Sequence, residues 1–484
     1  MGAKKRIGIV GGGITGLSAA YYLMRSLEER EVEAEIEIFE SRDRLGGVIN
    51  TEIRNDSLME DGPDSLFTAK ADALKLIDDL GLNSSIVETN RKKRRSLLAC
   101  DGELHPLPDG FVMLAPSEIL PFAGTEILST AGKLRTVMDL FIGPRLYGPE
   151  ESVAQFIRRR FGGEILEKIV QPMVGGIYVG DVEKLSAECT IPQFVELERT
   201  TGSIIAGLIG RRMNSLSGNG VSGARYGMFV SLNGGLGKLV SRLKDNLESC
   251  NFHFETRVSE VAPGDSHRDT GLRWNLSSVK KGGGSVDHSF DTVIMTLPAS
   301  NLAPTLKSLD EEITCDLEDI PCASSVVVNF LYDRDQCDYD FNGFGFVVPE
   351  GGNTSIIAGS FTSIKYPGRC PDDKVMIRAF LGGVLRGDIL EKSDEELVEL
   401  AHKDLARFLN ITGVPSSSYV SRWYDSMPQY QIGHKERVKR IFSKLNAYPG
   451  LYLAGNSYTG VGIPDCVASA KRAARACARY LSEN

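Results

Sequence analysis

The stretch from Arg6 to Gly16, which reads RIGIVGGGITG, decides the fold of this chain. Its first half is a short apolar run, and such a run predicts a buried strand that ends at the glycine cluster. Residues 14–29 carry apolar side chains at three- and four-residue spacing, so they predict a helix. A second apolar run at 35–40 predicts the next strand. Together these elements predict two parallel strands joined by a helix in a right-handed unit.

The pattern Gly11-x-Gly13-x-x-Gly16 indicates that this unit binds a dinucleotide. The first glycine permits a tight turn, the second lets the backbone approach a pyrophosphate, and the third lets helix and strand pack closely. Glu40, at the end of the second strand, can accept hydrogen bonds from ribose hydroxyls and would repel the 2′-phosphate of NADP. A plain glycine-rich turn would need none of these flanking features. The residues predicted to contact the dinucleotide here are Gly11, Gly12, Gly13, Ile14, Thr15, Gly16 and Glu40.

Composition and charge exclude several classes of protein. The chain has 484 residues, 42% of them hydrophobic, which excludes a globally disordered chain. It carries 55 Lys and Arg against 64 Asp and Glu, and the net charge of −9 argues against a general nucleic-acid binder. Nine scattered cysteines without a CxxC pair support neither a disulfide framework nor a zinc site, and six dispersed histidines predict no metal site. No apolar run approaches the roughly 18 residues of a membrane span, and the N-terminus lacks a signal-peptide pattern.

Two further stretches carry cofactor chemistry. After Glu40 the chain continues as SRDRLGG, and Arg44 stands where it can reach the pyrophosphate. Residues 451–465, LYLAGNSYTGVGIPD, predict a strand, a glycine-rich turn and a helix with Pro464 in its first turn. Taken alone, the first is also compatible with a surface arginine before a turn, and the second with a packed strand–turn–helix.

Both stretches resemble FAD signatures of the flavin-containing amine oxidase superfamily, and this resemblance implies FAD as the cofactor. The N-terminus of the last helix would then stabilise negative charge on reduced flavin. The resemblance adds to the predicted cofactor contacts Ser41, Arg44, Gly46, Gly47, Gly455, Asn456, Gly462, Ile463 and Pro464.

Longer blocks resemble the bacterial porphyrinogen oxidases of heme synthesis, most of all the Gram-positive type, over nearly the full length. These blocks are Gly62-Pro63-Asp64-Ser65, Pro172 with residues 176–181 and 185–186, Arg422-Trp423, residues 427–430 and 433–434, and residues 462–465. From this resemblance we add Gly62, Pro63, Asp64, Ser65, Val258 and Trp423 to the predicted cofactor contacts.

The same resemblance implies an enzyme that oxidises coproporphyrinogen III to coproporphyrin III. Six hydrogens would leave the macrocycle in three two-electron rounds, and oxygen would reoxidise the flavin with release of hydrogen peroxide. Protoporphyrinogen IX stays open as the alternative substrate. Lys70 is the candidate partner for a substrate propionate. The alternative is that Lys70 is simply a solvated side chain before a helix that starts near Ala71. Ile177 and Tyr178 are candidates for the apolar body of the pocket, with simple core positions as the alternative. The basic run Arg91–Arg95 is interpreted as a solvated face, with a propionate funnel or a contact with an anionic membrane as the alternatives.

The expected fold class is α/β, mixed with α+β: a Rossmann-like FAD-binding domain, an antiparallel-sheet substrate domain and a helical insertion. Residues 1–83, 227–300 and 421–484 are predicted to build the FAD-binding domain in three parts. Residues 84–226 are predicted to form the helical insertion and part of the substrate domain, and 301–420 the substrate-binding sheet. Within the insertion, Ser152 to Gln155 predict a capping box, and residues 164–170 predict a helix that Pro172 ends.

Two other functions stay open. An amine oxidase on the same scaffold needs an aromatic pair beside the flavin, for which Trp423 and Tyr458 are available, although the blocks around them match the porphyrinogen enzymes better. The GDP-dissociation inhibitors use a related fold as non-enzymatic binding proteins, but they have no need of two flavin signatures. The expected partners are a porphyrinogen and molecular oxygen, with no nucleic acid, in the cytoplasm. Peripheral membrane contact through residues 111–122 and transient contact with the next heme-pathway enzyme stay open, and a substrate-domain core is the favoured interpretation of that stretch.

Overall fold

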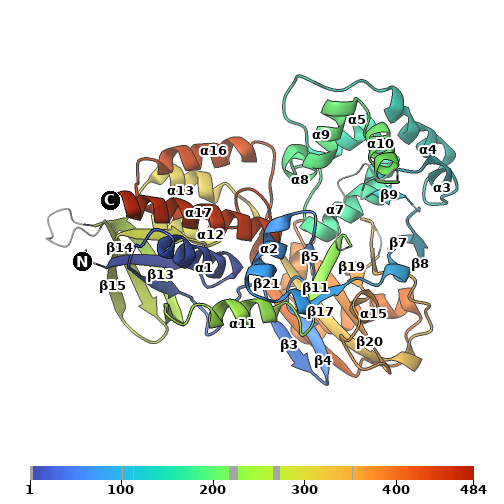
Figure 1. Cartoon of the computed structure of the whole chain (residues 1–484). Helices are drawn as coiled ribbons and strands as arrows, with labels where there is room; N and C mark the ends of the chain where they lie inside the picture. The colour runs from blue at the N-terminus through green and yellow to red at the C-terminus, as the bar shows by residue number, and fades with distance from the viewer. Residues whose placement is uncertain are drawn as a thin grey trace.

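The structure is a computed structural model that describes residues 4–100, 102–108, 110–112, 114–216, 227–264, 273–351 and 353–484. Figure 1 shows a lobe at the left around α1 and α17, a group of helices at the upper right, and an antiparallel sheet below that group. The mixed α/β architecture predicted from the sequence is confirmed. Among the described residues no helix is both long and apolar enough to cross a membrane.

A five-stranded parallel sheet forms the centre of the left lobe. Its strand order is β12-β2-β1-β16-β22. The strands are β1 (Lys5–Val10), β2 (Ala34–Phe39), β12 (Asn251–His253), β16 (Thr292–Met295) and β22 (Leu451–Leu453). With the helix α1 (Ile14–Glu28), β1 and β2 confirm the predicted strand–helix–strand unit. One sheet therefore unites the beginning, the middle and the end of the sequence.

Both faces of the parallel sheet are buried, as parallel sheets require. Side chains alternate between the two faces because successive residues of a strand point in opposite directions. One face packs under α1, α11 (Gly237–Asp245) and α17 (Ile463–Glu483), with α2 (Ala71–Asp79) beside them. The other packs against the antiparallel sheet of β13 (Thr256–Pro263), β14 (Trp274–Lys280) and β15 (Ser285–Phe290), and against α12 (Ala299–Leu302), α13 (Glu311–Glu318) and α16 (His434–Leu445).

A seven-stranded sheet lies on the other side of the molecule (Figure 1). Its order is β21-β17-β20-β19-β18-β7-β8, antiparallel throughout except for the β18–β7 pair. The strands are β7 (Ser96–Cys100), β8 (Glu103–Pro106), β17 (Cys322–Asp333), β18 (Gly345–Val347), β19 (Ile356–Ser360), β20 (Lys374–Gly382) and β21 (Ser417–Pro428). The helix α15 (Asp394–Leu409) packs on it. The boundary predicted at 420 falls inside β21, and the boundary predicted at 226 lies outside the described residues.

Two small sheets connect these parts of the chain. One hairpin pairs β3 (Thr51–Arg54) with β4 (Ser57–Glu60). A three-stranded sheet has β11 (Phe229–Leu232) between β5 (Leu66–Phe67) and β6 (Ile86–Glu88). Both lie near the segment around Gly62, which leads from the parallel-sheet lobe toward the antiparallel sheet.

The helical insertion has a core of its own. Its helices are α3 (Ile119–Ala123), α4 (Thr130–Val137), α5 (Val153–Arg160), α6 (Gly163–Ile165), α7 (Gln171–Tyr178), α8 (Ala187–Thr190), α9 (Pro192–Thr201) and α10 (Ile204–Leu216). The expected capping box at Ser152 is confirmed. Leu114 and Phe122 are buried in this core, as the favoured interpretation of the apolar stretch expects. Leu120 between them is exposed.

Pro172 does not end the preceding helix, which corrects our expectation that it would. A π-helical turn at Leu166–Val170 separates α6 from α7, and Pro172 occupies the first turn of α7. A proline is tolerated there because its missing N–H falls at the start of a new hydrogen-bonding register. The helical path therefore continues to Tyr178.

A fully buried ion pair ties the insertion together. The Arg160 guanidinium pairs with the Asp139 carboxylate and also donates to the carbonyl oxygens of Ile142 at 2.9 Å and Gly202 at 3.0 Å. Asp139 accepts further bonds from the Ser203 hydroxyl at 2.6 Å and the Ile205 N–H at 3.0 Å. All of these hydrogen-bond partners belong to the insertion itself.

We expect Arg160→Met to lower the free energy of unfolding by about 3–5 kcal/mol, because it leaves the Asp139 carboxylate buried without its charge partner. Urea denaturation followed by circular dichroism measures the loss. Arg158→Met is the matched control on the same helix, since its pair with Glu183 is about half exposed and is worth about 0–1 kcal/mol. Equal effects of the two substitutions would contradict this account of the insertion.

Candidate active site

The glycine-rich turn between β1 and α1 presents backbone at the head of the helix. A Cβ atom on Gly16 would lie 1.9 Å from the carbonyl oxygen of Gly11, so only glycine lets α1 pack onto the turn. Gly11 has a φ of +107°, a conformation that favours glycine. Gly13 is the N-cap of α1, and no described side chain caps this end. The first N–H groups of α1 are therefore available to an anion, as a pyrophosphate site needs.

A second glycine pair closes on this turn. Gly13 and Gly46 form an isolated parallel bridge, and a Cβ on Gly47 would lie 3.3 Å from the Cα of Gly13. A Cβ on Gly46 would lie 2.3 Å from the carbonyl oxygen of Ile49, so this position also requires glycine. Two backbone segments thus line one slot without side chains, and a bulky ligand can approach both of them.

Glu40 lies beside the turn and is almost fully buried. Its carboxylate accepts the Gly12 N–H at 2.8 Å and the Arg42 N–H at 2.9 Å. The Ser41 hydroxyl also donates to it, at 3.4 Å. A carboxylate has about four acceptor positions, so one stays available for a ribose hydroxyl. The Thr256 N–H donates to the Glu40 carbonyl at 2.8 Å and brings β13, with buried Val258, to the same edge.

The C-terminal motif lies at the head of α17. The Gly455 N–H donates to the Ser469 hydroxyl at 3.2 Å, and α17 begins at Ile463 as the sequence predicts. Lys70 is the N-cap residue of α2, and its Nζ lies 2.7 and 2.8 Å from the carboxylate oxygens of Asp465 in the first turn of α17. The Lys70 side chain is 50% exposed. Lys70 thus reaches the same helix end as the predicted cofactor contacts.

The N-termini of α1 and α17 lie against each other. The thiol of Cys466, in the first turn of α17, contacts Thr15 of α1, and burial raises the pKa of this thiol to about 11. Cys466 is therefore a packed, protonated thiol. Two motifs about 450 residues apart in sequence meet at one place.

Buried ion pairs hold the Gly62 motif in place. Asp64 pairs with Lys365 at 3.0 Å and with Arg378 at 3.5 Å, and Arg378 also donates to the Gly62 carbonyl. Burial opposes ionisation of Asp64, but Lys365 and Arg378 outweigh it and hold the pKa of this carboxyl below its usual range. The sequence motif indicated Asp64 but not its partners, which follow about 300 residues later without any local pattern.

Glu60 and Trp423 hold the same motif from two other directions. Glu60 pairs with Arg369 at 3.1 Å and accepts the Thr51 hydroxyl at 2.6 Å, while burial raises its pKa. The Trp423 indole donates to the carbonyl oxygen of Asp61 at 2.8 Å. The backbone from Glu60 to Asp64 is therefore fixed by groups from the antiparallel sheet and its loops.

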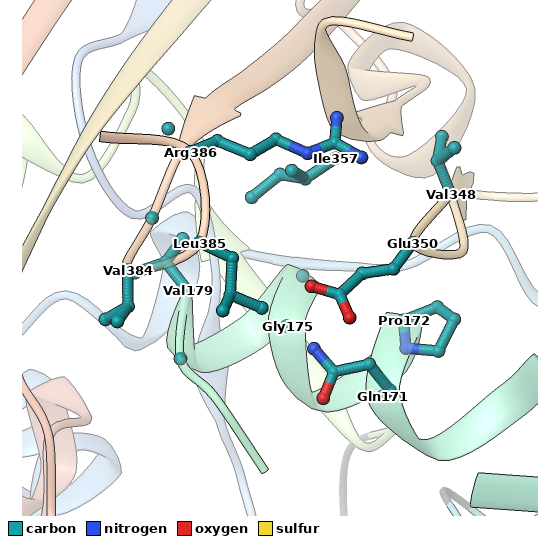
Figure 2. A pocket seen from close by; sticks show the side chains of 14 residues that line it. Gln171, Pro172, Gly175, Val179, Val348, Glu350, Ile357, Val384, Leu385 and Arg386 are labelled. Atoms are coloured by element: carbon teal, nitrogen blue, oxygen red, sulfur yellow. The ribbon is translucent and has the colours of Figure 1, made fainter. Parts of the chain in front are cut away.

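A cavity of about 30 Å³ lies between α7 and the ends of β19 and β20 (Figure 2). Gln171, Pro172 and Gly175 of α7 line it from one side, and Val348, Ile357 and Arg386 from the other. Its volume is close to that of one or two water molecules. A macrocycle would enter here only if α7 and the sheet separated.

Ile177 and Tyr178 stand at the end of α7, next to this cavity but not among its lining residues. Ile177 is 47% exposed, and the Tyr178 hydroxyl donates to the Thr190 carbonyl at 3.2 Å. Val179 follows with a φ of +48°, a strained conformation for a β-branched residue. Such strain often marks a segment with a functional constraint. The pocket-lining role of Ile177 and Tyr178 stays a prediction.

The basic run Arg91–Arg95 directly precedes β7 in the chain and is largely exposed. Arg91 pairs with Glu88 at 2.9 Å and Lys93 with Asp340 at 3.1 Å, while Arg94 donates to the Thr89 hydroxyl. These contacts agree with the favoured solvated face.

The residues present fit FAD. A dinucleotide requires three features that the chain has: the uncapped head of α1, the backbone slot of Gly13 and Gly47, and the spare acceptor position of Glu40. The head of α17 adds a second helix N-terminus at the same place, where negative charge is favoured.

Comparisons with known proteins agree with this site. The family model for flavin containing amine oxidoreductases matches residues 14–478. The coproporphyrinogen III oxidase of Bacillus subtilis (strain 168) is 34% identical over 479 residues, which cover 99% of each chain. The coproporphyrinogen III oxidase of Staphylococcus aureus is 31% identical and covers 97% of this chain and 98% of the relative. A crystal structure from Exiguobacterium sp. 255-15, described as that of a protoporphyrinogen oxidase, is of a chain 31% identical to this one. The match covers 99% of both chains, and the two structures superpose with a TM-score of 0.85.

These matches confirm the resemblance to the Gram-positive porphyrinogen oxidases and the identity of the cofactor. The family carries a flavin, and a flavin held by a dinucleotide cradle is FAD. The chain belongs to the flavin-containing amine oxidoreductase family.

Proposed function

We propose that this protein oxidises coproporphyrinogen III to coproporphyrin III with FAD as cofactor and oxygen as electron acceptor. The observation that carries the proposal is the full-length match to coproporphyrinogen III oxidases at 31–34% identity. The flavin cradle at both ends of the chain supports it. A cytoplasmic location, suited to nine cysteines that form no disulfide, is part of the same proposal.

The proposed reaction removes six hydrogens in three two-electron rounds. The chemistry that bound FAD supplies is acceptance of a hydride from the substrate in each round, with return of two electrons to oxygen. Three molecules of oxygen are thereby reduced to three of hydrogen peroxide. The chain's own task is to hold one methylene bridge of a large macrocycle against the cofactor.

Lys70 is the residue we propose for contact with a substrate propionate. Its ammonium group already pairs with Asp465, and a lysine has three donor hydrogens. It can therefore bind a second carboxylate without leaving the first. A vinyl group, which replaces two of the propionates in protoporphyrinogen IX, offers it no such contact.

The structure disfavours an amine oxidase on this scaffold. The Trp423 indole is 7% exposed and its N–H is committed to the Asp61 carbonyl. The Tyr458 ring is buried in the hydrophobic core and has the partly exposed Phe442 ring edge-on against it. These two rings are therefore poorly suited to flank an amine.

The direct test compares the two porphyrinogens. Purified, yellow protein is mixed with each substrate in air, and porphyrin fluorescence and hydrogen peroxide are followed together. We expect faster turnover of coproporphyrinogen III, with three peroxides for each porphyrin. Exclusive oxidation of protoporphyrinogen IX would assign the alternative substrate, and no oxidation of either would refute the proposal.

Gly13→Val should weaken FAD binding by at least about tenfold, or 1.4 kcal/mol, because the side chain would occupy the pyrophosphate slot. An added Cβ there meets only the Gly47 Cα, at 3.9 Å, so the chain itself should fold. Flavin content after purification and titration with FAD measure the effect. Gly284→Val, in an open surface turn, is the control. Full flavin occupancy in the Gly13 variant would show that the slot has another role.

Glu40→Ala should lower FAD affinity about tenfold while turnover of the fully loaded enzyme changes less than about twofold, since the ribose lies far from the reacting ring. The substitution also leaves the Gly12 and Arg42 N–H groups without their acceptor, which costs about 1–3 kcal/mol of stability. Glu40→Gln keeps an oxygen there and should limit that second loss. Reduced turnover at saturating FAD with unchanged affinity would argue against a ribose contact.

Lys70→Ala should reduce kcat/KM for coproporphyrinogen III by a few-fold to about tenfold, because a partly exposed charge pair is worth about 0.2–1 kcal/mol and more when water is excluded. The loss with protoporphyrinogen IX should be smaller if the propionate is one that vinyl replaces. Lys75→Ala, exposed on the same helix, is the control and should match the wild type. Unchanged kinetics in the Lys70 variant would mean that this side chain is solvated and does not contact the substrate.

A further inference from the structure

The segment between β21 and α16 crosses the loop that joins β22 to α17. This loop, residues 454–462, will be called the flavin loop, since it carries the predicted contacts Gly455, Asn456 and Gly462. Tyr430 of the crossing segment and His434, the first residue of α16, stack with ring centroids 4.1 Å apart and planes 16° from parallel. Both rings are almost completely buried. They form one rigid block beside the flavin loop.

The Tyr430 hydroxyl holds the flavin loop at two points. It donates to the carbonyl oxygen of Asn456, and it accepts the N–H of Gly460 at 2.9 Å. One oxygen atom therefore bridges two residues that lie four positions apart in the loop. A phenylalanine would fill the same volume but could make neither bond.

His434 holds the loop at a third point between those two. Its Nε2 lies 3.0 Å from the carbonyl oxygen of Tyr458. A carbonyl oxygen can only accept, so the hydrogen of the neutral ring is on Nε2. Burial lowers the pKa of His434 to about 4, so the ring is neutral at physiological pH. Its Nδ1 has no partner among the described residues, which leaves the bond to Tyr458 as the polar contact this ring makes.

The loop needs such external support because its sequence supplies little stiffness. It contains three glycines, and Gly455 has a φ of +140°. Glycine loses more conformational freedom on folding than any other residue. Three bonds to one stacked pair, at alternate residues 456, 458 and 460, select a single path for this backbone.

We propose that Tyr430 and His434 are positioning residues for FAD: their stacked pair sets the path of the flavin loop and thereby the place of the α17 N-terminus against the cofactor. Neither side chain needs to touch FAD. This inference rests on the flavin and not on the identity of the substrate, so it stands or falls separately from the proposed reaction.

The same segment also forms hydrogen bonds with the helical insertion. Gln429 donates from Nε2 to the Tyr178 carbonyl at 2.9 Å, at the end of α7. The Ser186 N–H donates to the Tyr430 carbonyl at 2.8 Å. Neighbouring residues of one short segment therefore position both the flavin loop and the end of α7. This segment links the flavin loop to the helical insertion.

The test is Tyr430→Phe, which keeps the ring and its stack but removes two hydrogen bonds. A net hydrogen bond is worth about 1 kcal/mol, or about fivefold, so we expect FAD affinity to fall about ten- to thirtyfold. We also expect the visible absorption spectrum of the bound flavin to change, because the α17 N-terminus shifts against it. Titration of the flavin-free chain with FAD measures both in the absence of substrate.

Tyr448→Phe is the matched control. The Tyr448 hydroxyl also has two contacts, the Leu309 carbonyl at 3.2 Å and the Asp310 carboxylate at 3.0 Å, in the same lobe but away from the flavin loop. It should lower the unfolding temperature as Tyr430→Phe does, with FAD affinity and spectrum unchanged. If both variants weaken FAD equally, the effect is general loosening and the proposal is overturned. Wild-type affinity and spectrum in Tyr430→Phe would overturn it as well.

His434→Phe provides a second test, which remains informative if Tyr430→Phe does not fold. It keeps the stack and removes the single bond to the Tyr458 carbonyl. We expect FAD affinity to fall about fivefold, again with a changed spectrum. Unchanged binding and spectrum in a folded His434→Phe protein would refute the positioning role.

Discussion

The close approach of backbone to backbone at the head of α1 is the constraint on which this structure depends. Gly16 packs its helix against the Gly11 carbonyl, and Gly13 bridges Gly46. A side chain on Gly16 would push α1 away from β1, and one on Gly46 would displace the following loop, whereas a side chain on Gly13 would only fill the slot. Because the backbone of Gly13 and Gly47 lines the slot, the free N–H groups of α1 are accessible to a ligand. The sheet order, with β1 at its centre, then brings the C-terminal helix to the same place.

A second level of organisation is electrostatic. Three basic side chains, Lys365, Arg369 and Arg378, enter the molecule from the antiparallel sheet and its loops and meet the acids Glu60 and Asp64. Buried charges need partners, since an isolated one costs several kcal/mol. The pairs therefore tie the sheet to the chain that follows β4. The antiparallel sheet is thereby held in register with the parallel-sheet lobe through charges that solvent hardly reaches.

Much of the fold and of the cofactor site could be predicted from the sequence. The first strand–helix–strand unit, the capping box at Ser152 and the start of the last helix follow from local patterns, and the structure confirms them. Pro172 was wrong as a helix end, because the π-helical turn before it shifts the hydrogen-bonding register. Such a turn depends on packing between helices, which no short pattern records.

The sequence by itself determined where glycine is obligatory and which strands are buried, because these depend on spacing within a few residues. The prediction that both ends of the chain hold one cofactor came from the family resemblance of two motifs. Only the tertiary structure decided that Lys70 pairs with Asp465, that Lys365 and Arg378 neutralise Asp64, and that Tyr430 and His434 hold the flavin loop. These contacts join residues as far as about 400 positions apart. Their geometry is set by how sheets and helices pack, and a sequence pattern carries no information about that distance.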